Sequence, residues 1–311
     1  MTSDPSVTIL NVGHGNAAVI RDGDVTVVVD TGGEHAGGKL LDYLRSEGLN
    51  DISALLLSHG DEDHIGSAPT LLLAKDILVR SVFVNTDTTK RTAAFGGLQL
   101  ALQTSRRERQ TVVTTSLTIA QTQLLPKKSL SFEILFPPPE STLTGAGGQN
   151  LDGTLQTTNS LSAVVRVSDG HTIRVLFPGD SDSSVLDFWK KERIDPSAEV
   201  VVFPHHGGRP GQEDPSTFAE AFTRATKPSC VVFSIHETKH ALPRSDVVVA
   251  ICTAQPSAQL ICTQLPSRLV PVCAQHPWSY HTSPAGTVSK LHVQVGLVTG
   301  GISIIKDDNL S

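Results

Sequence analysis

Potential metal ligands are concentrated in one short segment of this 311-residue chain. His59, Asp61, Asp63 and His64 fall within six residues, directly after the apolar run Ala54–Leu57. Where a strand ends in a tight loop, the alternation of its side chains gives way to a turn that gathers them around one point. Imidazole and carboxylate groups suit zinc, iron or manganese, and this density of them beside an apolar strand is not typical of a solvated surface. The segment therefore predicts a metal site.

Two further apolar runs lead to residues of the same kind. The run over residues 175–177 is followed by Asp180, and the run over 200–203 is followed by His205 and His206. Ligands at the ends of several strands are held on a rigid sheet, which is how a precise metal site is built. The three strand ends together indicate one site, and the sequence does not choose between the two adjacent histidines.

Short β-type runs alternate with helical patterns along the chain, and this alternation predicts the elements that position the ligands. The predicted strands cover residues 7–12, 17–20, 25–29, 54–57, 79–85, 111–119, 130–136, 161–167, 173–177, 200–203, 230–234, 288–297 and 302–305. The predicted helices cover residues 40–47, 65–73, 97–109, 183–192, 217–225 and 246–254. Mixed strands covered by helices indicate a layered α/β architecture.

The apolar segments are spread evenly, so a single domain over residues 1–311 is expected. Residues 137–158, rich in Pro, Gly, Thr and Ser, predict a loop insertion. With 39% hydrophobic and 18% charged residues, the composition excludes a disordered chain. No apolar run reaches the roughly 20 residues that span a bilayer, and the N-terminus lacks a leader pattern, so a cytoplasmic protein is expected.

The charge balance gives no general attraction to nucleic acid. The chain has 25 basic and 31 acidic residues, a net charge of −6, and its one compact basic cluster, Arg106, Arg107 and Arg109, is interpreted as a solvated helix face. A phosphodiesterase is nevertheless possible, because bound divalent cations reverse the local charge of a carboxylate-rich site.

The string His59-x-Asp61-x-Asp63-His64 resembles the HxHxDH motif of metallo-β-lactamase-fold hydrolases, with aspartate at the second histidine. Four further segments resemble the hydrolase domain of the competence protein ComEC: residues 11–16 are similar to its DVGQGD, 29–32 to its IDTG, 179–180 to its GD and 204–207 to its PHHGS motif. The matches run in order from residue 7 to about residue 250, and residues 240–243 are a counterpart of its HP element. The membrane segments of ComEC have no counterpart, so a free-standing relative is expected.

This resemblance implies an α/β fold of the αββα type, a metallo-β-lactamase-like four-layer sandwich. It implies two divalent metal ions and Asp180 as the carboxylate that bridges them. Because Asp61 and Asn159 stand where many relatives have histidine, the preference shifts from Zn²⁺ toward Mn²⁺, with Mg²⁺ possible. The implied metal ligands are His59, Asp61, Asp63, His64, Asp180 and one of His205 and His206.

Catalytic and supporting roles follow from the same resemblance. Asp63 would orient the attacking water and accept its proton, while His240 would protonate the leaving oxygen. Asp30 would orient a ligand histidine, and His14 lies in a loop that faces the site. Asn159 and Ser160 stand where relatives carry a further site motif. A structural turn residue is the alternative interpretation of His14, Asn159 and His240.

The leading functional hypothesis is a metal-dependent phosphodiesterase or nuclease that acts on DNA. One alternative is hydrolysis of a small substrate, such as a small phosphodiester, a cyclic nucleotide or a lactone, which the acidic net charge favours. Another is a non-catalytic, metal-stabilised subunit of a larger assembly. The expected partners are therefore nucleic acid or a small phosphodiester, with no membrane, and the sequence names no protein partner.

Overall fold

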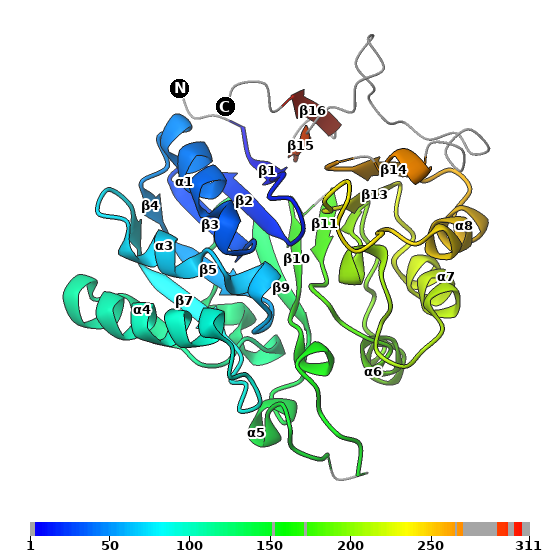
Figure 1. The fold of residues 1–311 in the computed structure, drawn as a ribbon, viewed down its shortest axis with the longest axis horizontal. Coiled ribbons are helices and arrows are strands. Elements are labelled where there is room, and N and C mark those ends of the chain that lie inside the picture. The colour runs from blue at the N-terminus through cyan, green and yellow to red at the C-terminus, as the bar shows by residue number, and fades with distance from the viewer. Residues whose placement is uncertain are drawn as a thin grey trace.

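Two β-sheets face each other, and helices cover the outer side of each, as seen in the computed structural model of the chain (Figure 1). The structure describes residues 4–150, 153–170, 173–264, 266–269, 291–297 and 302–306. The predicted αββα four-layer sandwich is confirmed. The prediction of one domain over residues 1–311 stays a prediction.

The first sheet has eight strands in the order β16-β15-β1-β2-β3-β5-β7-β8. The strands β3, β5, β7 and β8 run parallel, and the remaining neighbours are antiparallel. The strand bounds are β1 Ser6–Ile9, β2 Ala17–Asp22, β3 Val25–Thr31, β5 Ala54–Leu57, β7 Ser81–Val84, β8 Val112–Thr114, β15 Leu291–Gly296 and β16 Ile302–Lys306.

The second sheet has six strands in the order β14-β13-β12-β11-β10-β9, and β11 to β14 run parallel. A separate two-stranded sheet pairs β4 with β6. The strand bounds are β4 Asp51–Ile52, β6 Leu78–Val79, β9 Ser131–Phe136, β10 Val164–Ser168, β11 Arg174–Phe177, β12 Val200–Val202, β13 Cys230–Phe233 and β14 Gln259–Cys262.

The helices divide between the two outer layers (Figure 1). On the first sheet lie α1 Gly37–Ser46, α3 Ala68–Leu73 and α4 Ala93–Arg109. On the second lie α6 Ser184–Glu192, α7 Pro215–Thr226 and α8 Ser245–Ala254. Two one-turn helices, α2 Glu62–Ile65 and α5 Ser141–Thr144, lie in connections. Within the described residues no helix combines the length and the hydropathy needed to cross a membrane.

The alternation of side chains along each strand explains why four layers form. In β5, Leu56 joins the core between the sheets, whereas Leu55 and Leu57 pack beneath the helices of the first half. In β12, Val202 faces the same central core, and Val201 packs with the outer core of the second half. Because both faces of these strands are buried, they consist of continuous apolar runs.

Three local predictions differ from the structure. The predicted helix over 65–73 is divided into α2 and α3, because Pro69 in the first turn of α3 cannot extend a preceding helix. The predicted strand over 111–119 is shorter and ends at Thr114. The predicted strand over 79–85 is divided between β6 and β7, and the short strands β4 and β14 were not predicted.

The described residues of the segment 137–158, where the sequence predicts a loop insertion, are mostly irregular and carry the short helix α5. Residues 151 and 152 lie outside the described residues. The rest of the insertion is tied to the loop after β7: Thr88 donates a hydrogen bond to the carbonyl oxygen of Ala146, and Thr158 donates one to Asp87. The insertion therefore lies against a loop that, as described below, borders the candidate site.

Candidate metal centre

The carboxyl ends of four strands bring distant chain segments to one place. Strands β3 and β5 are parallel neighbours in the first sheet, and β11 and β12 are parallel neighbours in the second. Since parallel strands end at the same edge of a sheet, the segments that follow them meet between the two sheets. The residues that these segments bring together are Asp30, His59, Asp61, Asp63, His64, Asp180, His205 and His206.

Four of the predicted ligands form a compact group: Asp63, His64, Asp180 and His206 offer ligand atoms that all lie within 4.8 Å of one another. His206 Nε2 lies 3.0 Å from Asp63 Oδ2, and His64 Nε2 lies 3.4 Å from Asp180 Oδ1. The group is largely buried, with only Asp63 partly exposed.

A second group shares Asp180 with the first. Its Oδ2 atom lies 3.5 Å from His205 Nδ1 and 4.0 Å from His59 Nε2, and Asp61 Oδ2 lies 3.4 Å from His59 Nε2. The two carboxylate oxygens of Asp180 thus face two different sets of side chains. The structure brings both His205 and His206 to Asp180, the first on the Oδ2 side and the second on the Oδ1 side.

The donor atoms of these groups fit divalent cations. The Nε2 atoms of His59, His64 and His205 are buried and form no hydrogen bond within the described part of the chain. Buried polar atoms are normally paired, so several unpaired imidazole nitrogens that lie beside carboxylates indicate a missing positive partner. Imidazole and carboxylate together suit first-row metal ions. The residues present therefore fit a divalent metal.

The opposite nitrogen of two ligand histidines is held in place by another group. His64 Nδ1 donates to Asp30 Oδ2 at 2.7 Å, and His206 Nδ1 donates to the carbonyl oxygen of Ser234 at 2.8 Å. Such bonds orient each ring with Nε2 toward the carboxylates, where a bound cation would take the place of the Nε2 proton.

Asp30 holds two parts of the site with one carboxylate. Besides His64, it accepts hydrogen bonds from the backbone N–H and the hydroxyl of Ser58, at 2.7 and 2.8 Å. Only 2% of its surface is exposed, and its backbone has a left-handed φ of 56°. The placement is the one expected of a residue that orients a ligand histidine.

The two adjacent histidines lie in a strained turn. His205 and His206 have φ angles of 51° and 55°, a left-handed conformation that costs a non-glycine residue energy. The turn is fixed by a hydrogen bond from the His205 backbone N–H to Asp180 Oδ1 at 3.1 Å. Strain at such a position is typical of a functional site, and here it directs two consecutive imidazoles toward one carboxylate.

Charge interactions keep the carboxylates ionised. Burial by itself raises the pKa of Asp180, but His205 and His64 outweigh it, and the resulting pKa lies well below the usual value. Burial likewise opposes the charged form of His64, yet Asp30 and Asp180 raise its pKa well above the usual range. The site therefore presents ionised oxygen ligands at neutral pH.

A cavity of about 580 Å³ opens beside Asp63. His14 lies on its wall, with Nε2 3.4 Å from Asp63 Oδ2, and the His240 ring lies 4.3 Å from that of His14. Burial, followed by the neighbouring His206, lowers the pKa of His14 to about 4, so this imidazole is neutral at pH 7. The exposed His240 lies near the site but is not among the grouped ligands. Lys39, His236 and Lys239 also line the cavity.

The residues expected from the third motif lie at the margin. Asn159 is half-exposed and begins the turn Asn159–Leu161. The Ser160 hydroxyl bonds the backbone of Thr157 and does not join the described ligand cluster. Ser162, two residues further on, contacts the ligand cluster instead. Its hydroxyl lies 3.3 Å from His59 Nδ1 and accepts a hydrogen bond from the Asp180 backbone N–H at 3.0 Å.

Three other contributors were missed by sequence reasoning. Ser58 precedes His59 at the end of β5, and Ser234 follows β13, so the strand-end signal that found the ligands could also have found these residues. Lys90 forms an ion pair with Asp61, 29 positions away, and no local signal marks it.

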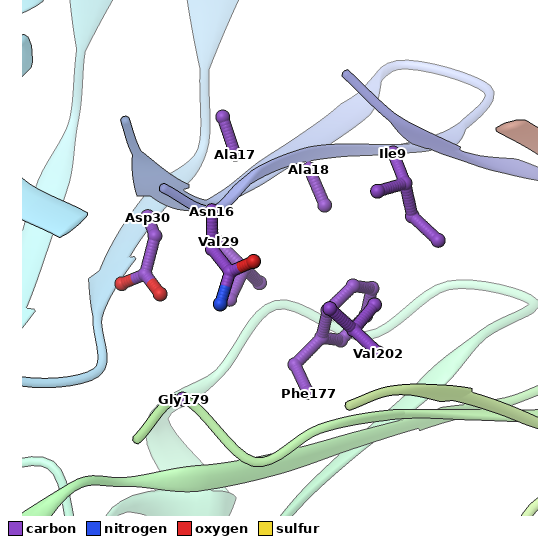
Figure 2. Close-up of a pocket in the computed structure, with 9 residues that line it drawn as sticks. All are labelled: Ile9, Asn16, Ala17, Ala18, Val29, Asp30, Phe177, Gly179 and Val202. Atoms are coloured by element: carbon purple, nitrogen blue, oxygen red, sulfur yellow. The ribbon is translucent and has the colours of Figure 1, made fainter. Parts of the chain in front are cut away.

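The apolar core lies directly behind Asp30. A cavity of about 10 Å³ lies there. Ile9 and Ala18 of the first sheet face Phe177 and Val202 of the second across it (Figure 2). It is too small for a substrate. The partly exposed ligands are Asp61 and Asp63, so the candidate site is open to solvent on their sides and not through the core.

Gly15 → Ala is expected to displace residues 59–64, the metal loop that carries four candidate ligands. A Cβ at Gly15 would lie 2.2 Å from the backbone oxygen of Asp63, and the glycine has a φ of +125°. Since both the contact and the conformation are unfavourable, we expect a loss of about 1–3 kcal/mol in the free energy of unfolding, together with weaker metal binding. Urea unfolding and metal titration would measure the two effects. Gly48 → Ala, at an open position of positive φ, is the control for backbone strain alone; equal losses in the two variants would contradict a specific clash.

Comparison with known proteins gives one family match. Residues 10–208, more than half of the chain, match the model described as "Metallo-beta-lactamase superfamily". The matched range includes every candidate ligand from His59 to His206.

The similar proteins differ widely in their sequence identity to this chain. "Recombination protein 2" of Haemophilus influenzae is 40% identical over 73 residues, which is 22% of this chain and 9% of that protein. Among solved structures, the metallo-beta-lactamase fold protein YhfI of Bacillus subtilis has a TM-score of 0.50 at 14% identity, over 83% of this chain and 96% of that chain. Igni18, described as a metallo hydrolase of Ignicoccus hospitalis, has a TM-score of 0.47 at 15% identity, over 82% and 94%.

Proposed function

From the premise that this chain belongs to the metallo-β-lactamase superfamily of metal-dependent hydrolases, we propose that its substrates are phosphodiesters and that it acts as a nuclease on DNA. The superfamily fold alone does not choose a substrate, because one fold hosts many activities. The choice depends on the groups that surround the metal site.

The observation that carries the proposal is the composition of the cavity beside Asp63. Its wall includes two lysines, Lys39 and Lys239, and four imidazoles, together with three carboxylates; the imidazoles are those of His14, His35, His236 and His240, and the carboxylates those of Glu34, Glu62 and Asp63. Cationic and hydrogen-bond-donating groups next to a cation site favour an anionic substrate, although the chain as a whole is acidic. A neutral lactone would gain little from the two ammonium groups. A phosphodiester would be attracted mainly by the bound cations, which offset the carboxylates of the wall, and its oxygens would accept hydrogen bonds from the lysines and imidazoles.

The candidate ligands form two groups, each of which would hold one divalent cation. One divalent cation would be held by Asp63, His64, Asp180 and His206, and a second by His59, Asp61, Asp180 and His205. Such cations supply Lewis-acid activation of water and of a phosphoryl oxygen.

Proton transfer would fall to groups on the cavity side. Asp63 is ionised, because the charges of His64 and His206 outweigh burial and hold its pKa below the usual value. Its carboxylate borders the cavity, where it would orient a water molecule and accept its proton. His14 is neutral and lies against this carboxylate, where it orients Asp63. His240, exposed at the same cavity, is placed to give a proton to the leaving oxygen.

The likeness to competence proteins supports a nucleic-acid substrate. The curated relative that matches part of this chain is named for recombination, and the motif variant of this chain resembles the ComEC hydrolase domain. A DNA polymer is therefore the first substrate to test.

The purified protein, supplied with Mn²⁺, Zn²⁺ or Mg²⁺, is expected to degrade single-stranded DNA and plasmid and to release p-nitrophenol from bis(p-nitrophenyl)phosphate. Gel electrophoresis and absorbance would follow the two reactions, and a chelator should stop both. An Asp63 → Ala, His64 → Ala double variant, checked for folding by circular dichroism, is the control for contaminating nuclease.

The outcomes separate the competing functions. Hydrolysis of the small ester without cleavage of DNA would replace the nuclease by a small-molecule phosphodiesterase. No hydrolysis of any ester by the metal-loaded protein, with cellular function retained in the double variant, would indicate a non-catalytic subunit of a larger assembly.

A further inference from the structure

A second cavity lies on the Asp61 side of the candidate metal centre. Its volume is about 440 Å³, within the usual range for small-molecule sites, and its wall comes from the loop after β7 and from helix α4. The cavity beside Asp63 is lined by different residues. One cavity thus reaches Asp63 of the metal loop, and the other is lined by Lys90 and Phe95.

Two contacts connect this second cavity to the metal loop. Gly60 separates the candidate ligands His59 and Asp61, and a Cβ at Gly60 would lie 3.2 Å from Cε2 of Phe95 and 3.4 Å from Cγ of Lys90. The Phe95 ring therefore packs against the backbone of the metal loop. The ammonium group of Lys90, also on the cavity wall, pairs with Asp61. A molecule bound in this cavity would therefore lie next to a substrate bound at the metal centre.

The lining combines three kinds of group. Phe95, Leu98 and Leu102 on α4 give an aromatic and aliphatic surface. Gln99 and Thr115 add an amide and a hydroxyl. The charged groups are Lys90, which pairs with Asp61, Arg91, and the carboxylate of Asp87, whose oxygens accept hydrogen bonds from Thr89 and Thr158. An aliphatic chain would leave the polar groups without partners, and a bare phosphate would leave the aromatic surface uncovered. A planar heterocycle with polar edges that is joined to an anion matches all three.

We propose that this cavity binds the nucleobase adjacent to the scissile phosphate, with one face stacked on Phe95. The proposal rests on the function proposed above and specifies its substrate class as nucleotide esters. The phosphate would extend from the base toward the metal centre past Lys90, and the group on its other side would enter the cavity beside Asp63. The cavity therefore confers a preference for nucleoside esters over simple phosphodiesters.

The test compares two esters that release the same chromophore, thymidine 5′-(p-nitrophenyl phosphate) and methyl p-nitrophenyl phosphate. The wild-type protein is expected to prefer the thymidine ester, and Phe95 → Ala is expected to lower the ratio of the two kcat/KM values about tenfold, since stacking of a base on an aromatic ring has that order of effect. Phe95 → Tyr should retain the preference. Leu100 → Ala is the matched control, because Leu100 is 64% exposed on the same helix and does not line the cavity.

The ratio separates this proposal from the proposed function. Hydrolysis of both esters with an equal ratio in wild type and Phe95 → Ala would overturn the nucleobase site and leave the phosphodiesterase standing. If neither ester is hydrolysed, calorimetric titration with thymidine 5′-monophosphate and with inorganic phosphate still tests whether the cavity binds a nucleobase. A nucleotide-to-phosphate affinity ratio that falls about tenfold in Phe95 → Ala supports the site, and an unchanged ratio refutes it.

Discussion

Asp180 → Ala is expected to remove the bound metal and to lower hydrolysis by more than the ~100-fold that is typical when a residue only orients a ligand. The physical reason is that Asp180 belongs to both ligand groups: Oδ1 lies 3.4 Å from His64 Nε2, and Oδ2 lies 3.5 Å from His205 Nδ1. No other carboxylate among the described residues has contacts of this kind on both sides.

Metal content measured by mass spectrometry after dialysis, and kcat/KM on the ester that the protein cleaves, would provide the two readouts. Asp180 → Asn separates charge from shape, because an amide oxygen can still accept the His205 backbone N–H. We expect Asn at this position to preserve the fold and still to lose metal. Asp187 → Ala, an exposed carboxylate on α6, is the matched control. Full metal content and activity within tenfold of wild type in Asp180 → Ala would contradict a shared ligand.

Asp30 → Ala is expected to destabilise the metal-free protein by about 3 kcal/mol, because it leaves the Ser58 backbone N–H and His64 Nδ1 buried without an acceptor. Some of this loss comes from the backbone, since alanine tolerates the φ of 56° less well than aspartate or asparagine. Metal affinity should also fall by about 10- to 100-fold as His64 loses its orientation.

Asp30 → Asn isolates the charge, since asparagine tolerates the left-handed backbone. Ser58 → Ala keeps the backbone bond to Asp30 and removes the hydroxyl, which bonds Asp30 and also lies 3.0 Å from His59 Nδ1. It should cost about 1 kcal/mol. Urea unfolding of the chelator-treated proteins gives the free energies, and competition with a metal indicator gives the affinities. If Asp30 → Ala cost no more than Ser58 → Ala and bound metal normally, the assigned role of Asp30 would be wrong.

The sequence was informative wherever the chemistry is local. His59, Asp61, Asp63 and His64 are close in the chain and follow an apolar strand, so their common location needs no knowledge of the fold. The central strands were equally visible, because burial on both faces demands continuous apolar runs such as residues 200–202. The number of bound cations stays a prediction.

Other features depended on packing between distant segments. His206 contacts Asp63, which lies 143 positions away in the chain. The sequence also could not assign His205 and His206 to different oxygens of Asp180. Ser160 was expected near the site, yet its hydroxyl bonds the backbone of Thr157 within the turn Asn159–Leu161, and the hydroxyl of Ser162 lies beside His59 instead.

The amino-acid sequence by itself determined which side chains could bind metal and which strands would carry them, since residue type and short-range periodicity are local properties. Only the tertiary structure decided how Asp180 is shared, which serine supports His59 and where Lys90 and Phe95 meet the metal loop. These relations depend on the register and spacing of two facing sheets, and those follow from side-chain packing across the whole core rather than from any one segment.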